Sequence, residues 1–231
     1  MTNWVAKSSI FPTSSNSGVN WLFTTTLDGN LATHVGDDPE RVRSHRQTLI
    51  ERVGHPIAWM DQVHGDQVLT VDSQHLPDRS ADAEITADPA LALGVLVADC
   101  IPLLLWSKEC IAVAHVGRRG VANEIASKTV ERMRVEFGAS DVEALIGPAI
   151  CGSCYEVPME LHDEVARRWP TASSRTPQGT PALDLPVAVA AQLESLGLVI
   201  HHDRRCTREE PSLYSYRRDS GSGRFAGVIW R

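Results

Sequence analysis

The chain has 231 residues, with 22 Lys+Arg against 29 Asp+Glu and a formal net charge of −7 at pH 7. This acidic balance argues against a fold-wide nucleic-acid surface, so we expect no nucleic-acid partner. Hydrophobic residues make up 42% and charged residues 22%, as in ordinary globular proteins, which excludes a wholly disordered chain. The length suits one large domain, and we expect a single domain over residues 1–231.

Features of export and membrane insertion are missing from the sequence. No apolar run reaches the ~18–20 residues that a membrane-spanning helix needs. The first residues lack the basic-then-apolar layout of a secretion signal. The five cysteines form an odd, sparse set, which favours reduced thiols over a disulfide framework. We therefore expect a cytoplasmic protein without a membrane partner, either a monomer or a homodimer.

The first part of the chain predicts short strands around one helix. Pro39 suits a first helical turn and Gly54 suits a helix end, so a helix is expected from Pro39 to about Val53. Runs of apolar, β-branched and aromatic residues predict the nearby strands. These strands are expected at 19–26, 57–60 and 67–71.

The centre of the chain is its most apolar part. Three runs with little alternation, at 90–98, 102–106 and 110–116, indicate strands that are covered on both faces. An apolar stripe over Gly120–Phe137 predicts one helix. Further helices are expected at 158–169 and 186–196, strands at 142–146, 199–200 and 225–230, and a surface loop at 170–181. This order predicts an α+β fold, with a mixed β-sheet core flanked by helices.

Three polar side chains stand where predicted strands meet turns. His64 follows a short strand, Cys100 joins two apolar strands and His115 lies near the end of a third. Such strand ends are where folds present side chains to a cleft. A two-residue hairpin loop at 107–108 would set Cys100 opposite His115, with Cβ atoms about 5 Å apart. A three-residue loop would place them on opposite faces.

One thiolate and two imidazoles are a suitable ligand set for Zn²⁺. Catalytic zinc often keeps three protein ligands and leaves the fourth position for water. Without a metal, Cys100 and His115 would form a nucleophile and base pair. Spacing alone favours a third interpretation, a buried thiol beside two packed imidazoles, because no short-range metal motif such as HExxH is present.

Other polar motifs carry weaker signals. Arg118 and Arg119 precede the central helix, where guanidinium groups suit a phosphate or carboxylate, but a solvated turn fits equally well. The run Tyr216–Asp219 is a similar anion candidate. Cys151 and Cys154 form C-x-x-C, which is only half of a structural zinc site, so we interpret them as ordinary loop cysteines.

Motifs spread over nearly the whole chain carry a family resemblance. They are THVGDDPERV (33–42), DQVHGDQV (61–68), LALGVLVADCIPLLL (91–105), AVAHVGRRG (112–120), LIGPAICGSCYEV (145–157), and SYRRD with GRFAGVIW (215–230). Through them the chain resembles the bacterial YfiH family, the laccase-domain or "polyphenol oxidase" family, whose members are regarded as purine nucleoside phosphorylases.

The resemblance implies a fold, a site and an activity. The fold would be an α+β sheet similar to that of cysteine hydrolases. His64, Cys100 and His115 would bind catalytic Zn²⁺ or Cu²⁺, and Arg119 would belong to the catalytic site. The activity would be phosphorolysis of adenosine, inosine and methylthioadenosine, with adenosine deamination as a side activity. The partners would then be a small purine nucleoside and phosphate.

Two departures from the family pattern bear on the substrate. The usual Thr-Arg-x-Gly-Gly-Val-Ser loop is replaced by Thr24–Asn30 without the Arg, and the usual His-Ala-Gly-Trp-Arg-Gly motif has Arg118 in place of Trp. These changes affect the places expected to bind phosphate or stack a base. Asp99, with Glu156 as a second choice, is the candidate for proton transfer in deamination.

Three alternatives to phosphorolysis follow from the same residues. The first is a hydrolase with Cys100 as nucleophile and His115 as base, acting on an amide such as a peptidoglycan precursor. The second is a non-catalytic relative that binds a ligand. The third, copper-dependent phenol oxidation, is disfavoured because multicopper oxidases use His-x-His pairs, and the sequence has none.

Overall fold

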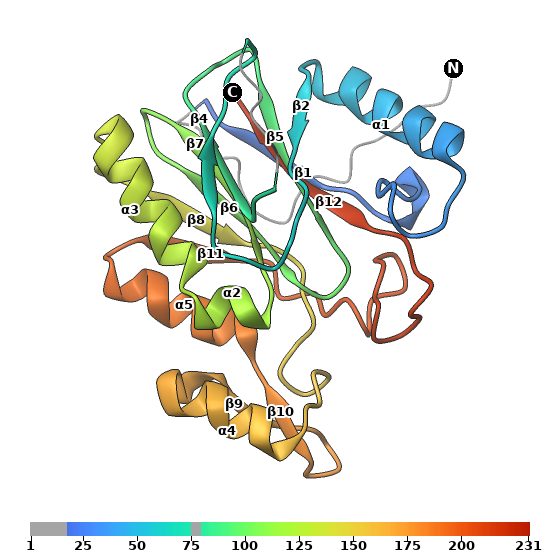
Figure 1. Cartoon of the computed structure of the whole chain (residues 1–231), viewed down its shortest axis with the longest axis vertical. Coiled ribbons are helices and arrows are strands. Elements are labelled where there is room, and N and C mark those ends of the chain that lie inside the picture. The colour runs from blue at the N-terminus through green and yellow to red at the C-terminus, as the bar shows by residue number, and fades with distance from the viewer. Residues whose placement is uncertain (1–17, 75–79) are drawn as a thin grey trace.

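Two β-sheets form the centre of the molecule in the computed structural model, which describes residues 18–74 and 80–231 (Figure 1). The smaller sheet has the strand order β1-β12-β5-β2. In it β2 runs parallel to β5, whereas β12 is antiparallel to both β1 and β5. Its strands are β1 (Asn20–Phe23), β2 (Ile57–Trp59), β5 (Ala92–Val97) and β12 (Phe225–Trp230).

The larger sheet has the order β11-β8-β6-β7-β4-β3. It is also mixed, because its two outer pairs are parallel and its inner pairs are antiparallel. Its strands are β3 (Val68–Thr70), β4 (Ala83–Thr86), β6 (Ile101–Trp106), β7 (Ile111–Val116), β8 (Glu143–Ile146) and β11 (Val199–His202). The prediction of a mixed β-sheet core flanked by helices is therefore confirmed.

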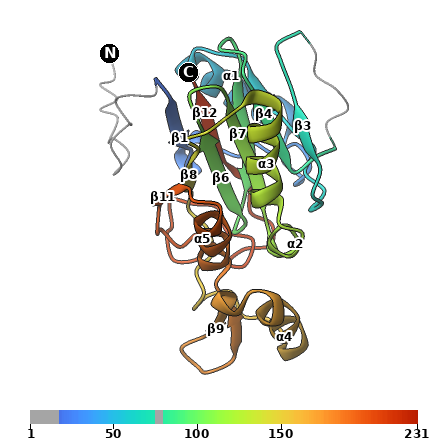
Figure 2. The same cartoon turned by 90° about the vertical axis from the view of Figure 1, so that its left-hand side faces the viewer.

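Helices cover the outer faces of the two sheets, as Figures 1 and 2 show for α1, α3 and α5. A β9–β10 hairpin and α4 form a lobe beyond the larger sheet. The α-helices are α1 (Pro39–Val53), α2 (Arg118–Ala122), α3 (Ile125–Phe137), α4 (Met159–Arg168) and α5 (Leu185–Ser195). The remaining elements are the 3-10 helices η1 (Thr26–Asp28) and η2 (Pro170–Ala172) and the strands β9 (Ser173–Arg175) and β10 (Pro181–Leu183).

The core has separate apolar layers on the two sides of the larger sheet. Leu103 and Leu105 of β6 belong to the cluster beneath α3 and α5, which includes Met133 and Leu193. Leu104, between them in sequence, faces the smaller sheet instead. Because successive strand residues point to opposite faces, a strand covered on both sides is apolar throughout. This explains why the central strands lack alternation, as predicted.

The local signals of α1 work as the sequence predicted. Asp38 caps the first turn by accepting a 2.9 Å hydrogen bond from the backbone N–H of Glu40. Pro39 occupies the first turn, and Gly54 ends the helix in a left-handed conformation, φ 79°. Apolar residues of α1 then pack on the outer face of the smaller sheet.

Several sequence-based expectations were wrong. The single helix expected over 120–137 is two helices, because Glu124 adopts φ 58° and breaks the path between α2 and α3. The loop expected at 170–181 contains η2 and β9 and the start of β10. Strand β4 was not predicted.

The predicted hairpin register was also wrong. A four-residue connection joins β6 to β7 at 107–110, and Pro102, not Cys100, pairs with His115. Within the described ranges no helix is long and apolar enough to cross a membrane.

The sandwiched position of Leu104 predicts a large effect of truncation. We expect Leu104→Ala to lower the free energy of unfolding by about 2–5 kcal/mol, because the fully buried side chain would leave a cavity between the sheets. Leu27→Ala is the control, since that side chain is 88% exposed and should change stability by less than about 0.5 kcal/mol. Urea unfolding measures both, and equal effects would contradict this account of the core.

Candidate metal centre

Three side chains singled out from the sequence converge at one end of the larger sheet. His64 comes from the loop after β2, Cys100 directly precedes β6, and His115 lies in β7. Their ligand atoms all lie within 4.8 Å of one another. Cys100 Sγ is 4.0 Å from His64 Nε2, and the two imidazole rings meet edge to face with centroids 4.6 Å apart. One thiol and two imidazoles therefore share a common centre.

The backbone approaches this centre closely at Gly117, which follows β7. A Cβ atom at Gly117 would lie 3.0 Å from Cys100 Sγ and 3.3 Å from the His64 ring. Real Cβ atoms rarely come so close, so the position suits glycine. His64 and Asp99 adopt left-handed conformations, with φ 57° and 92°. Such conformations are uncommon outside glycine and need support from surrounding contacts.

Asp82 supplies that support for His64. Its buried carboxylate accepts hydrogen bonds from the backbone N–H groups of Val63, His64 and Gly65, at 3.3, 3.0 and 2.6 Å. It also lies 2.8 Å from Nδ1 of His115. The carboxylate accepts a hydrogen bond there, so Nδ1 carries a hydrogen, and Nε2 is the ring nitrogen left to bind an ion at the shared centre.

Asp99 holds the Cys100 side of the site. Its carboxylate accepts a 2.6 Å hydrogen bond from the Thr207 hydroxyl and a 2.7 Å bond from the backbone N–H of Arg217. Both oxygens are thus engaged in tying distant loops to the start of β6. Glu156, the other candidate proton carrier, is exposed and is not among the residues that line the pocket beside Cys100.

Cys100 and His115 shift each other's protonation. Burial raises the pKa of the Cys100 thiol, but the neighbouring charge of His115 and hydrogen bonds from His115 and His64 outweigh it and lower the pKa to about 6. Burial lowers the pKa of His115, while the Cys100 thiolate and Asp82 raise it to about 9. Without a metal, the two groups therefore form a thiolate and imidazolium pair at neutral pH.

Burial raises the pKa of Asp82 as well. Its hydrogen bonds with His115 and the backbone N–H of Gly65 outweigh that effect and hold the pKa below its ordinary value. The carboxylate is therefore ionised at neutral pH. A charged acceptor beside His115 favours the Nδ1–H form of the ring.

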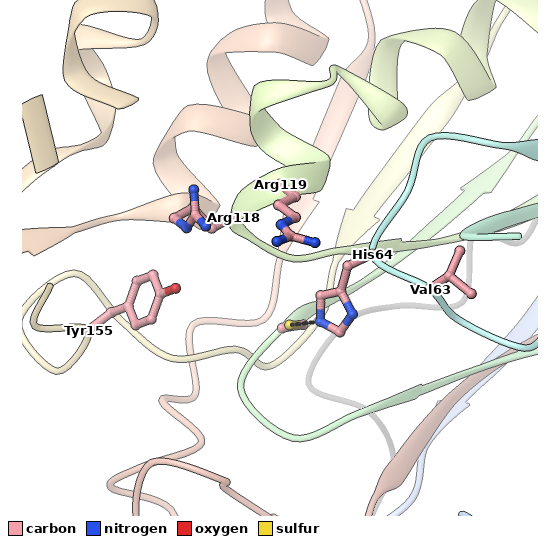
Figure 3. A pocket seen from close by; sticks show the side chains of 6 residues that line it. Val63, His64, Arg118, Arg119 and Tyr155 are labelled. Atoms are coloured by element: carbon pink, nitrogen blue, oxygen red, sulfur yellow. Dashed lines mark hydrogen bonds between the residues drawn. The ribbon is translucent and has the colours of Figure 1, made fainter. Parts of the chain in front are cut away.

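A pocket of about 260 Å³ opens beside the cluster (Figure 3). Arg118 and Arg119 from the start of α2, Tyr155 and His64 surround it, and Cys100 also lines it. The Arg217 guanidinium lies 4.6 Å from the centroid of the Tyr155 ring. The arrangement combines a cationic wall, one aromatic ring and a nucleophilic thiol.

The donor set fits a transition metal. Sulfur and imidazole nitrogen are preferred ligands of Zn²⁺, and both also bind copper. The Asp82–His115 pair has the carboxylate–histidine arrangement that orients imidazole ligands at metal sites. Metal binding at neutral pH would displace a proton of the His115 imidazolium, whereas Cys100 is already a thiolate.

Sequence reasoning missed Asp82. The residue directly precedes a four-residue strand that was not predicted, and nothing in its immediate neighbours marks it as functional. The hydrogen-bond partners of its carboxylate are 17 or more positions away. Only the pairing of β4 with β7, which places Ala83 opposite Ala114, makes the link to His115 visible.

Known proteins resemble this chain over most of its length. It is 44% identical over 214 residues to a purine nucleoside phosphorylase of Streptomyces coelicolor, covering 87% of each protein. It is 41% identical over 210 residues to a purine nucleoside phosphorylase of Mycobacterium tuberculosis, covering 87% of this chain and 84% of that protein.

Among solved structures, YlmD from Geobacillus stearothermophilus matches with a TM-score of 0.84 at 30% identity, covering 93% of this chain and 92% of that chain. The YfiH protein of Bacillus licheniformis matches with a TM-score of 0.82 at 26% identity, covering 92% of each. Fold and site together define a laccase-like protein of the YfiH type. The model of the family described as multi-copper polyphenol oxidoreductase laccase matches residues 14–231, and the chain belongs to that family.

The contacts of Asp82 generate a prediction on metal affinity. We expect Asp82→Asn to weaken metal binding at the His64, Cys100 and His115 cluster by about 10–100-fold, because the amide orients the His115 ring less firmly. Competition with a chromophoric chelator measures the affinity. Asp66→Asn, which alters an exposed partner of Lys128, is the control. Equal affinities for the two variants would rule out the orienting role.

The lowered pKa of Cys100 generates a second prediction, for the metal-free protein. Alkylation of Cys100 by iodoacetamide should stay fast down to about pH 6 and slow below it, because the thiolate is the reactive form. An ordinary thiol, with a pKa near ~8.5, would already slow below neutral pH. Peptide mass mapping reports the rate at Cys100. Cys110, whose pKa is raised by burial, is the internal control and should remain unmodified.

Proposed function

We propose that the chain is a purine nucleoside phosphorylase for adenosine, inosine and methylthioadenosine. One observation carries the proposal: two of the three candidate metal ligands, His64 and Cys100, line the same pocket as two arginines. The names of relatives at 44% and 41% identity agree with this chemistry. Phosphorolysis breaks the bond from sugar C1′ to the purine nitrogen and forms a bond from C1′ to a phosphate oxygen, with a proton passing to the purine.

Phosphate binding is assigned to the cationic wall of the pocket. Arg118 and Arg119 start α2 and line the pocket together. Charge-assisted hydrogen bonds from guanidinium groups are the strong means of holding a phosphate. Arg118 occupies the place of the Trp in the usual motif of the family that the chain resembles, so this chain has an additional cation at the wall. That cation can offset the missing Arg of the 24–30 loop.

Stacking of the purine is assigned to Tyr155. Its ring borders the pocket, and Arg217 lies against it and fixes its orientation. Aromatic rings and nucleobases stack well because both present flat π surfaces. Tyr155 can therefore supply the aromatic surface that the Trp-to-Arg change at position 118 removes.

His64, Cys100 and His115 are proposed to hold Zn²⁺ or Cu²⁺. When bound, the ion would supply Lewis acidity for polarising an oxygen or nitrogen of the substrate. Asp82 keeps the proton of His115 on Nδ1 and so presents Nε2 as a ligand atom. Arg119 stabilises negative charge on phosphate as the glycosidic bond opens through an oxocarbenium-like state. Adenosine deamination is the side activity of this proposal: water adds to C6 of the purine and ammonia leaves, which gives inosine.

A second candidate function rests on the thiolate and imidazolium pair. Cys100 with a pKa of about 6 and His115 with a pKa of about 9 match the charge state of a cysteine hydrolase nucleophile and its acid. An amide such as a peptidoglycan precursor would then be the substrate. A metal requirement distinguishes the two functions, since a bound ion would occupy the sulfur that the hydrolase needs.

Three expectations from the sequence stay predictions. They are a single domain over residues 1–231, a cytoplasmic location, and assembly as a monomer or homodimer.

Base release from a nucleoside panel tests the proposal. Adenosine, inosine and methylthioadenosine are incubated with the protein, with and without phosphate and chelator, and base, sugar 1-phosphate and inosine are separated. We expect base and sugar 1-phosphate only with phosphate, and loss of both after metal removal. Turnover of an amide that survives chelation, without base release, would replace phosphorolysis by the hydrolase.

The role of Arg119 can be measured in the same assay. We expect Arg119→Ala to raise the KM for phosphate by about 10–100-fold, because a charge-assisted hydrogen bond contributes ~1.5–3 kcal/mol. Arg167→Ala, on the exposed end of α4, is the control. An unchanged KM for phosphate would remove Arg119 from the phosphate site.

A further inference from the structure

Three of the five cysteines gather in a second cluster that shares no residue with the candidate metal centre. Cys151 and Cys154 come from the turn after β8, and Cys206 and Glu209 from the turn after β11. One ligand atom from each of the four lies within 4.8 Å of the others. We propose that these side chains form a structural zinc site.

The two arms of the cluster have matching backbone geometry. In the first, the backbone N–H groups of Cys154 and Tyr155 both donate to the carbonyl of Cys151, each at 3.0 Å. In the second, the N–H groups of Glu209 and Glu210 donate to the carbonyl of Cys206, at 3.1 and 2.8 Å. Each arm is thus a tight turn that brings residues i and i+3 to one side. The C-x-x-C of the sequence finds its partner in a C-x-x-E.

Backbone hydrogen bonds to sulfur connect the arms. The N–H of Cys151 donates to Sγ of Cys206 at 3.4 Å. This contact ties the start of the first arm to the sulfur of the second arm. The opposite arm supplies Cys154, whose thiol lies 3.3 Å from Glu209 Oε1.

Distances and ligand types favour zinc. Bonds of ~2.3 Å at a tetrahedral ion separate the sulfur atoms by about 3.8 Å. The four ligand atoms already lie within 4.8 Å of one another without an ion, so small side-chain movements would bring them to bonding distance of Zn²⁺. Three thiolates select thiophilic ions over Mg²⁺ and Ca²⁺, and a carboxylate is an accepted fourth ligand of Zn²⁺. Each thiol releases its proton on binding.

The alternative to a zinc site is that these cysteines are buried thiols that only fill the core. Cys110 fits that description better. Cys110 is fully buried and belongs to the apolar cluster beneath α3 and α5. Cys151 and Cys154 are partly exposed and belong to none of the apolar core clusters of the described residues. Their environment is polar, and Arg208 binds the carbonyl of Cys154 at 3.1 Å. A polar and partly exposed environment suits the binding of an ion better than the packing of a thiol in the core.

The position of the cluster gives it a structural role at the pocket. Tyr155, the aromatic wall, follows Cys154 directly, and Thr207, which holds Asp99, follows Cys206. The arms meet beside a bridge between Ala149 and Cys206. An ion there would clamp the two loops that frame the pocket, and its loss would loosen both.

The test uses the full chain carrying Cys100→Ala, which removes the sulfur ligand of the other cluster. Purified with reductant and zinc, this protein should hold about one zinc per chain by mass spectrometry of the metal. Adding Cys154→Ser or Cys206→Ser should reduce the zinc to background. Substitution with Co²⁺ should produce a thiolate-to-cobalt charge-transfer band that these two variants lack. Because the Cys100→Ala protein lacks a ligand of the candidate metal centre, the result does not depend on the proposed function.

Glu209→Gln guards against variants that fail to fold, because this side chain is exposed and its change should leave the fold intact. We expect its Kd for Zn²⁺ to rise by at least about tenfold, equivalent to ~1.4 kcal/mol. The matched controls are Cys110→Ala for a thiol and Glu160→Gln for an exposed carboxylate, and both should retain the zinc. Absence of zinc from the Cys100→Ala protein, zinc unaffected by the cluster variants, or a disulfide within the cluster would each overturn the proposal.

Discussion

The buried carboxylate of Asp82 is the contact on which the candidate metal centre depends. It binds three successive backbone N–H groups of the His64 turn and the imidazole of His115, so it joins a loop to a strand from the inside of the protein. A buried carboxylate is costly unless it is well hydrogen-bonded. These contacts meet that cost, and they also support the left-handed conformation of His64 and keep a hydrogen on Nδ1 of His115. One carboxylate thus acts on both the conformation of His64 and the protonation of His115.

The layered core explains why the pocket opens where it does. Both sheets and their covering helices fill the interior with side chains from both strand faces, and the pocket beside Cys100 lies at the strand ends instead. The strand ends are different, because loops from β2, β5, β8 and β11 meet there and bring polar groups with them. Asp99 and Tyr155 show how these loops are interlocked, one through hydrogen bonds and the other through contact with Arg217.

The sequence predicted what local patterns determine. Helix α1 has the predicted bounds because its caps lie within the segment, and β5 to β7 were identified because burial on both faces leaves continuous apolar runs. His64, Cys100 and His115 were identifiable as polar residues at strand ends. Asp82 and Cys206 were not, because each becomes significant only through partners far along the chain. Cys206 meets Cys151 across 55 positions, a separation at which spacing carries no signal.

The glycine after β7 also constrains how such a protein can change. A methyl group at position 117 would meet the sulfur of Cys100 before anything else, so even the smallest replacement there requires the thiol to shift first. A side chain at 117 is therefore easier to accommodate when a smaller group stands at position 100. Glycine at 117 and cysteine at 100 thus constrain each other, so a lineage that keeps the thiol has a reason to keep the glycine.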